Sequence, residues 1–181
     1  MEMYFIALVA PEYIGKEALK WKLWMKEKYD CEVALKSPAH ITLVPPFWMN
    51  PESENELAAF LDDFSLMQYS FIIQLKNFFH FGYKVIFIDV PENEEINRVR
   101  NSLFNSLLSA AKFPVKKDER FFHPHITIAT RDLHKRAFHE AWEYFKEKNY
   151  AAGWAVENIS LLKHDKKNWN VIHTFQFKKK F

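Results

Sequence analysis

Four segments of the chain carry hydrophobic residues every three or four positions, the spacing typical of amphipathic helices. The second segment follows Asn50 and Pro51, which suit the N-cap and the first position of a helix. The third runs from about residue 92 to 112, and the fourth starts near Asp132. The inward positions of the four segments are Ile14, Ala18, Trp21 and Met25; Leu57, Phe60, Leu61 and Phe64; Ile96, Val99, Leu103, Leu107 and Ala110; and Leu133, Ala137, Phe138, Ala141, Trp142 and Phe145. The pattern therefore predicts four helices, each with one buried face.

Short apolar runs between these segments predict seven β-strands. In chain order they read MYFIALV, AHITLV, SFIIQLKNF, KVIFIDV, HPHITIA, ENISLLKH and NVIHTFQF. The residues DKKNW between the last two runs predict a hairpin, and Gly82 with Tyr83 predicts a turn between the third and fourth runs. Helices and strands mixed in this way along one chain indicate the α+β class.

The order of these elements repeats along the chain. After the first strand, the series helix, His-Ile-Thr strand, helix and further strands occurs twice, and the two histidines of the repeated strings are 85 residues apart. This spacing is close to half of the 181-residue chain, so it predicts an internal duplication with halves of roughly 1–90 and 91–181. No linker-like stretch separates the halves. We therefore expect residues 1–181 to form one domain of two lobes.

The repeated strings, HITL and HITI, place polar side chains in apolar strands. Side chains at positions i and i+2 of a strand share one face. His40 therefore lies beside Thr42, and His125 lies beside Thr127. If the two strands face each other, one imidazole can accept a proton while the other donates one. A single histidine in such a strand is usually structural, but two equivalent ones favour acid–base chemistry on a phosphodiester.

Composition restricts how such a site can hold phosphate. The chain has only three glycines, far apart in the sequence, so it lacks the glycine-rich loops that bind phosphate through backbone N–H groups. The hydroxyls of Thr42 and Thr127 are the expected substitutes. The net charge of +2 is too small to indicate nucleic-acid binding by itself. Cys31, the single cysteine, has acidic neighbours that raise a thiol pKa, so we do not expect it to be a nucleophile.

The two tetrapeptides have flanks, PPF after the first and PHITIA around the second, that resemble the paired motifs of the two-histidine (2H) phosphoesterase superfamily. That superfamily includes 2′-5′ RNA ligase-like proteins and cyclic nucleotide phosphodiesterases. The resemblance implies an α+β fold of two pseudo-symmetric lobes, with antiparallel sheets around a central cleft and helices on the outside. It also implies that His40 and His125 are catalytic and that Thr42 and Thr127 bind the phosphate.

One position departs from the family's pattern. RNA-directed relatives often carry an arginine two residues after the second motif, but here that position is Thr130 and the arginine is Arg131. A shift of one residue along a strand reverses the face on which a side chain lies. We therefore expect Arg131 to bind substrate only if the strand has ended before it.

Three further residues are candidates for the site. Phe47 and Trp48 follow the first motif, where an aromatic ring can stack on a base, although the many aromatic residues of the chain favour core packing for either ring. We include Phe47 among the substrate-binding residues. His123 shares the face of His125 and lies either in the cleft or at the strand edge. A metal site on these two histidines would lack a carboxylate or cysteine at ligand spacing, so we expect no metal.

These observations favour a metal-independent phosphodiesterase without a cofactor. Its expected substrate is a 2′,3′-cyclic phosphate or a 2′-5′ bond in an RNA end or a small nucleotide. The alternatives are 2′-5′ ligation by the reverse reaction, a non-catalytic RNA- or nucleotide-binding protein, and a metallohydrolase. The N-terminal apolar run follows Glu2 rather than a basic segment, and no run is long enough to span a membrane. We therefore expect a cytoplasmic monomer that does not contact a membrane.

Overall fold

The computed structural model describes residues 1–118 and 120–180, and within them the chain forms nine strands, four α-helices and two short 3₁₀ helices. The strands are β1 (Glu2–Val9), β2 (His40–Met49), β3 (Phe71–Lys76), β4 (Phe78–Phe81), β5 (Val85–Asp89), β6 (His125–Ala129), β7 (Ala151–Val156), β8 (Asn158–His164) and β9 (Trp169–Gln176). The helices are α1 (Glu12–Tyr29), η1 (Val33–Lys36), η2 (Pro51–Ser53), α2 (Glu54–Ser65), α3 (Glu94–Ala110) and α4 (Lys135–Lys146).

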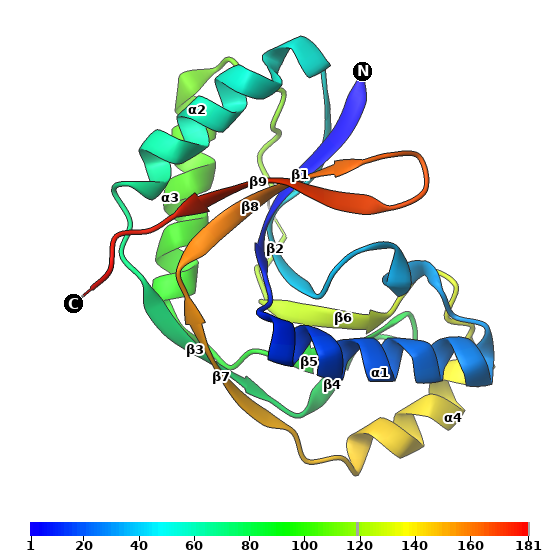
Figure 1. Ribbon diagram of the computed structural model, residues 1–181. Helices are drawn as coiled ribbons and strands as arrows, with labels where there is room; N and C mark the ends of the chain where they lie inside the picture. Colours follow the sequence, from blue (N-terminus) through cyan, green and yellow to red (C-terminus); the bar gives the residue numbers. More distant parts are fainter. Residues whose placement is uncertain (119, 181) are drawn as a thin grey trace.

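The strands form three sheets with antiparallel pairing between neighbours. One sheet has four strands in the order β2-β1-β8-β9, one has three in the order β4-β5-β6, and β3 pairs with β7. Figure 1 shows the two larger sheets in separate lobes, with the β3–β7 pair running between them along one side. This arrangement confirms the predicted α+β class with antiparallel sheets.

Two of the helices, α1 and α3, pack on the sheet of the lobe to which their preceding strand does not belong. Helix α1 follows β1 in the chain but packs on β6 of the three-stranded sheet, where α4 contacts β4. Helix α3 follows β5 but contacts β2 of the four-stranded sheet, where α2 packs on β8 and β9. Each lobe is therefore completed by a helix whose preceding strand belongs to the other lobe (Figure 1).

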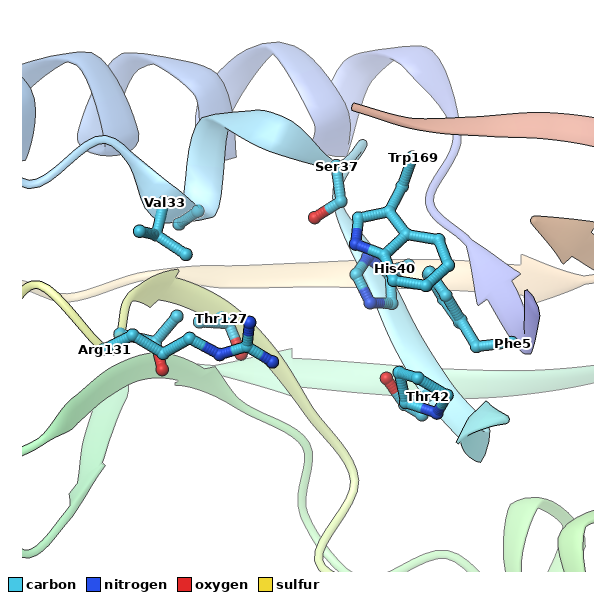
Figure 2. A pocket seen from close by; sticks show the side chains of 11 residues that line it. Phe5, Val33, Ser37, His40, Thr42, Thr127, Arg131 and Trp169 are labelled. Carbon is cyan, nitrogen blue, oxygen red and sulfur yellow. The ribbon is translucent and has the colours of Figure 1, made fainter. Parts of the chain in front are cut away.

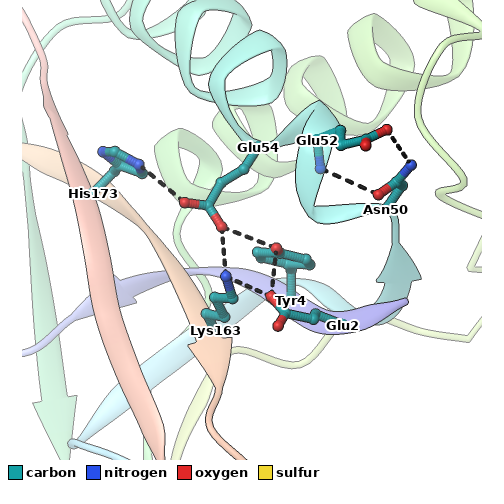
Figure 3. Close-up of polar contacts among 7 residues, drawn as sticks. All are labelled: Glu2, Tyr4, Asn50, Glu52, Glu54, Lys163 and His173. Atoms are coloured by element: carbon teal, nitrogen blue, oxygen red, sulfur yellow. Dashed lines mark hydrogen bonds and ion pairs between the residues drawn. The ribbon is translucent and has the colours of Figure 1, made fainter.

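The N-terminal end of α2 is fixed to the four-stranded sheet by polar contacts (Figure 3). The carboxylate of Glu54 accepts hydrogen bonds from the Tyr4 hydroxyl on β1 and from Lys163 Nζ on β8, both at 2.9 Å. Just before it, the Asn50 side chain accepts from the backbone N–H of Glu52 at 3.2 Å, and Pro51 occupies the first helical turn. Asn50 therefore acts as an N-cap, but of the short helix η2 that leads into α2, whose own N-cap residue is Ser53.

Some predicted elements differ from the structure: one predicted strand is divided in two, one strand was not predicted, and one helix begins later than predicted. The run SFIIQLKNF divides into β3 and β4 at Asn77, whose φ of 57° lies in the left-handed region. Its side chain accepts a hydrogen bond from Tyr150 N at 3.0 Å, just before β7 begins. Strand β7 itself was not predicted, since its sequence AAGWAV has few bulky residues. Likewise, α4 begins at Lys135 rather than near Asp132.

The hydrophobic core contains the aliphatic residues of both motifs, and this burial determines where the motif histidines and threonines point. Ile41 and Leu43 in β2, and Ile126 and Ile128 in β6, are at most 1% exposed. Because successive strand residues alternate between faces, burying these four aliphatic side chains directs the intervening histidine and threonine to the opposite face. The hydrophobic pattern thus fixes which way the polar pairs point. No helix in the described part of the chain combines the length and apolar character needed to cross a bilayer.

Candidate active site

The two His-x-Thr motifs occupy equivalent places in the two lobes. Each lies on the outermost strand of its sheet, β2 in one and β6 in the other, and these two strands contact each other. On β2, His40 pairs with Val9 and Thr42 with Ala7 of β1. On β6, His125 pairs with Asp89 and Thr127 with Phe87 of β5. The register brings both motifs to the junction between the lobes, as the sequence repeat predicts.

Both imidazoles are held in the same orientation by backbone oxygens. His40 Nδ1 lies 2.7 Å from the Pro38 carbonyl oxygen, and His125 Nδ1 lies 2.6 Å from the His123 carbonyl oxygen. A carbonyl oxygen only accepts hydrogen bonds, so each Nδ1 carries a hydrogen. The lone pair of the neutral imidazole is then on Nε2, the nitrogen left free for proton transfer.

Aromatic rings surround both histidines. The ring of Phe5 lies 4.8 Å from that of His40, and the rings of Phe81 and Phe87 lie 5.0 and 4.9 Å from that of His125. Burial among these groups disfavours the charged imidazole. It lowers the pKa of His40 to about 4, with help from the nearby charge of Lys22, against the opposing effect of the Pro38 carbonyl.

The second histidine differs from the first in its electrostatic surroundings. Burial again lowers the pKa of His125, and the nearby charge of His123 adds to this effect, whereas the His123 carbonyl and, to a smaller extent, the carboxylate of Asp89 oppose it. The residue that pairs with His40 at the equivalent position is Val9, which carries no charge. The two imidazoles are therefore alike in geometry but not in the charge beside them.

A cavity of about 220 Å³ brings together four of the predicted site residues, His40, Thr42, Thr127 and Arg131. Figure 2 shows Thr127 and Arg131 on the side of the cavity opposite Trp169 and His40. The remaining lining residues are Phe5, Val33, Ala34, Ser37, Pro46, Thr130 and Trp169. Hydroxyl, imidazole and guanidinium groups thus converge on one small space, as the binding of an anionic group requires.

His125 lines an adjoining cavity of about 470 Å³, which shares Thr42 with the first. His123 lies in this second cavity too, and its Nε2 is 2.7 Å from Asp89 Oδ1. His123 therefore lies in the cleft beside His125, partly exposed. Among the described residues, no group of three His, Cys, Asp or Glu side chains is arranged to hold a metal ion.

Arg131 follows the end of its strand, which is the condition under which we expected it to bind substrate. Strand β6 ends at Ala129, and Arg131 follows with a φ of 56°, in the left-handed region. This turn releases the side chain from the alternation of the strand, and Figure 2 shows it extending into the cavity. Within the described residues, its guanidinium forms no ion pair with a carboxylate, so it remains available to an anion.

Asp132 fixes this turn, and nothing in the sequence pointed to it. Its Oδ2 accepts hydrogen bonds from the backbone N–H groups of Glu32 and Val33, at 2.7 and 2.9 Å, at the start of η1. Its backbone oxygen also accepts from Cys31 Sγ at 3.6 Å. These contacts join the Arg131 turn to η1, whose Val33 lines the same cavity. Only the folded chain brings residues 100 positions apart into this contact.

Phe47 and Trp48 lie away from the His40 cavity. Phe47 is only 7% exposed and stacks on Tyr4 in the core, with 6.3 Å between ring centroids. Trp48 is 54% exposed, and both rings line a different cavity of about 440 Å³. The structure therefore does not bring Phe47 to the motif residues, because its alternating strand position points into the core. Burial also raises the pKa of Cys31 to about 11, consistent with an unreactive thiol.

Two antiparallel lobes, joined at edge strands that each carry a histidine and a threonine, define the class of two-histidine phosphoesterases. The chain belongs to the 2′-5′ RNA ligase superfamily, which it matches over residues 11–168. The resemblance of its two motifs to this class is therefore confirmed.

Solved structures show the same fold. The protein TT0787 of Thermus thermophilus aligns at 16% identity and a TM-score of 0.68, covering 99% of this chain and 100% of its own. E. coli LigT complexed with 3′-AMP aligns at 18% identity and a TM-score of 0.69, covering 97% and 98%. The MHV ns2 PDE domain aligns at 14% identity and a TM-score of 0.54, covering 90% and 99%. No curated protein matches the chain in a sequence comparison.

Proposed function

We propose that the protein is a metal-independent phosphodiesterase that hydrolyses a 2′,3′-cyclic phosphate or a 2′-5′ phosphodiester of RNA or a nucleotide. One observation carries this proposal. Two histidines at equivalent ladder positions have the same Nδ1–carbonyl contact, and each lines one of two cavities that meet at Thr42. A protein that only bound nucleotides would not need two imidazoles with free Nε2 atoms at the junction of its lobes.

The different surroundings of the two histidines suggest their roles. His40 has a strongly lowered pKa and is neutral near pH 7, so it suits the general base. Its Nε2 takes a proton from water as the water oxygen attacks phosphorus. Burial lowers the pKa of His125 too, but the carboxylate of Asp89 opposes this shift, so His125 is the better candidate of the two for the general acid. In its protonated form it gives the Nε2 proton to the ribose oxygen that leaves as the P–O bond breaks, so one proton enters and one departs.

Thr42, Thr127 and Arg131 would hold the phosphate. Threonine hydroxyls donate hydrogen bonds to the nonbridging oxygens, where negative charge grows in the transition state. The guanidinium of Arg131 adds a positive charge on the same side of the cavity as Thr127 (Figure 2). This set of donors substitutes for the backbone N–H groups of a glycine-rich loop.

A nucleotide or an RNA end fits the site as substrate. Structures of E. coli LigT, which shares the fold, contain 3′-AMP, ATP and NADP+. The MHV domain of the same fold is described as a PDE domain. Of the two cavities that meet at Thr42, the one of about 470 Å³ is of the size that small ligands occupy, and the one of about 220 Å³ adjoins it. Ligation of 2′-5′ ends would use the same groups in reverse.

A substrate panel tests the proposal. The purified protein would be incubated, in excess chelator, with 2′,3′-cyclic mononucleotides, RNA ending in a cyclic phosphate, and 2′-5′-linked dinucleotides. We expect turnover of at least one of them, and a loss of roughly 10²- to 10⁴-fold in both His40→Ala and His125→Ala. The double variant should be little worse than the poorer single variant, since the two histidines act as a unit.

Two results would contradict the proposal. Activity lost on chelation and restored by a divalent metal would favour a metallohydrolase. Tight nucleotide binding with no turnover of any substrate would favour a non-catalytic binding protein. His134→Ala serves as the matched control, because this histidine precedes α4 and lines neither of the two cavities that contain the motif histidines.

A further inference from the structure

Lys22 on α1 occupies an unusual position for a lysine. Among the described residues it is the one charged side chain in the buried class, with an exposed fraction of 3%. Burial lowers its pKa to about 8. Burying an ammonium group without a carboxylate partner costs free energy, and an apolar side chain of the same length would avoid that cost. Such a residue calls for an explanation beyond packing.

The contact of the ammonium group leads directly to the first motif. Lys22 Nζ donates a hydrogen bond to the Ser37 carbonyl oxygen at 3.1 Å. The next carbonyl along the chain, that of Pro38, accepts the Nδ1 hydrogen of His40 at 2.7 Å. The backbone is secured again at Ala39, whose carbonyl accepts from Ala10 N at 2.9 Å. The lysine therefore holds the peptide unit adjacent to the one that orients the imidazole.

The same segment separates Lys22 from the proposed site. Lys22 lines a cavity of about 380 Å³ on one side of residues 37–39, and His40 lines the cavity of about 220 Å³ on the other. Ser37 and Trp169 contribute to the walls of both. The ammonium is thus behind the first motif, close to His40 but outside the cavity that holds the phosphate-binding groups.

Among the described residues, the charged groups that act on His40 are positive. Lys22 approaches from α1, His125 lies on β6, and Arg131 extends into the cavity from the turn after β6. The residues that line the His40 cavity include no carboxylate. The charges of Lys22 and His125 both oppose a positive charge on His40, and of the two Lys22 lies behind the motif segment, away from the two cavities that contain the motif histidines.

We propose that Lys22 is a positioning residue for His40: it fixes the Ser37–Pro38 backbone that orients the imidazole, and its charge adds to the effect of burial in disfavouring a protonated ring. The kinetic part of this inference rests on the proposed phosphodiesterase activity, whereas the part that concerns protonation does not.

Lys22→Met tests the inference, because methionine has a similar length but neither the charge nor the N–H donors. NMR titration of the His40 ring should show its pKa rising toward that of a free imidazole. The acid limb of the kcat/KM profile should move to higher pH with it, and kcat should fall by roughly 10-fold as the imidazole loses its fixed orientation. The melting temperature should not fall, because a buried charge has been removed.

Lys16→Met is the matched control, since it removes the same charge from the exposed side of the same helix. Lys22→Gln keeps N–H donors without the charge, so it should reproduce the shift in the His40 titration; it also provides a folded variant if Lys22→Met does not fold. An unchanged His40 titration and a kcat within twofold of the parent would overturn the inference. If no substrate is turned over, the proposed function fails, and the NMR titration still decides the role of Lys22.

Discussion

Thr42 and Thr127 hold equivalent places in their strands but have different surroundings. Thr42 lines both the cavity of His40 and that of His125, whereas Thr127 lines the first of these. Both side chains are half-buried, and both alternate with aliphatic residues that enter the core. A phosphate bound between the two histidines would therefore be within reach of Thr42 from both cavities, but within reach of Thr127 from only one. We expect the Thr42 hydroxyl to contribute more than the Thr127 hydroxyl.

Replacing each threonine by valine keeps the shape of the side chain and removes the hydroxyl. We expect Thr42→Val and Thr127→Val each to lower kcat/KM by roughly 10- to 100-fold, as the loss of a hydrogen bond to a charged group would, with the larger effect at Thr42. Thr174→Val is the control, because this threonine contacts the Ser160 hydroxyl at 3.1 Å instead. Normal kinetics with a lowered melting temperature would show that the hydroxyls are structural.

The protonation of the two histidines predicts the pH profile. A general base must be neutral, so kcat/KM should fall on the acid side as pH drops through the pKa of His40, about 4. A general acid must be protonated, so kcat/KM should fall on the alkaline side as pH rises through the pKa of His125. Since burial lowers this pKa, the alkaline limb should lie below pH ~6.5, the value of a free imidazole.

Substrate should move this profile. A bound phosphate anion favours both protonated imidazoles, so the bell of kcat should lie at higher pH than that of kcat/KM. Steady-state rates across overlapping buffers, with chelator present, measure both bells. A rate that rises to an alkaline plateau would instead indicate a metal-bound hydroxide and would rule out the paired histidines.

At the scale of the element, alternation along strands was the most informative feature of the sequence. It predicted correctly the faces of the two motif strands on which the histidines and threonines lie. A shift of one residue would have buried these polar side chains and exposed the aliphatic ones, so the pattern allows only one assignment. The turn residues were harder to predict. Arg131 has a left-handed φ that only Gly, Asn and Asp adopt readily, so its sequence gives no sign of the turn that directs it inward.

Residues that act through tertiary contacts could not be predicted in the same way. Lys22 has the spacing of an inward position, four residues after Ala18, but its charge predicts a solvated side chain, and Asp132 reads as the start of a helix. Each serves the site through backbone groups of a segment remote in sequence, which periodicity does not reveal. Phe47 was assigned to the site from its proximity in sequence, whereas its strand position carries it into the core.

The turn after β6 offers a test at this scale. Asp132→Ala removes the acceptor for two backbone N–H groups at the start of η1, which should cost about 1–3 kcal/mol in the free energy of unfolding. The turn that carries Arg131 should also loosen, so KM should rise more than kcat falls. Asp62→Ala, on the surface of α2, is the control for loss of a carboxylate. A stable variant with normal KM would show that the turn keeps its shape without Asp132.

At the scale of the whole molecule, neither half of the chain contains a complete lobe. The four-stranded sheet takes β1 and β2 from the first half and β8 and β9 from the second. Helices α1 and α3 each pack on the sheet that their preceding strand does not join. Each lobe therefore depends on both halves for its hydrophobic core, although the sequence repeat divides the chain near its middle.

This exchange predicts cooperative unfolding. Residues 1–90 and 91–181, expressed separately, should remain unfolded, since each would expose the apolar face that the other half covers. The full chain should unfold in a single transition, with circular dichroism and tryptophan fluorescence giving the same denaturant midpoint. Two separated transitions, or a folded half, would show instead that the lobes are independent.

The packing of α1 and α3 on the opposite lobes has a consequence for the origin of such a protein by duplication. A peptide with one repeat could complete its core only by pairing with an identical peptide, and the twofold axis of that homodimer would place two identical histidines at the interface. Symmetry would then give both imidazoles the same neighbours. Joining the repeats in one gene removes that constraint: the residue opposite one histidine can become Val9 while its counterpart becomes Asp89. Covalent fusion thus lets the two imidazoles of a symmetric pair acquire different neighbours.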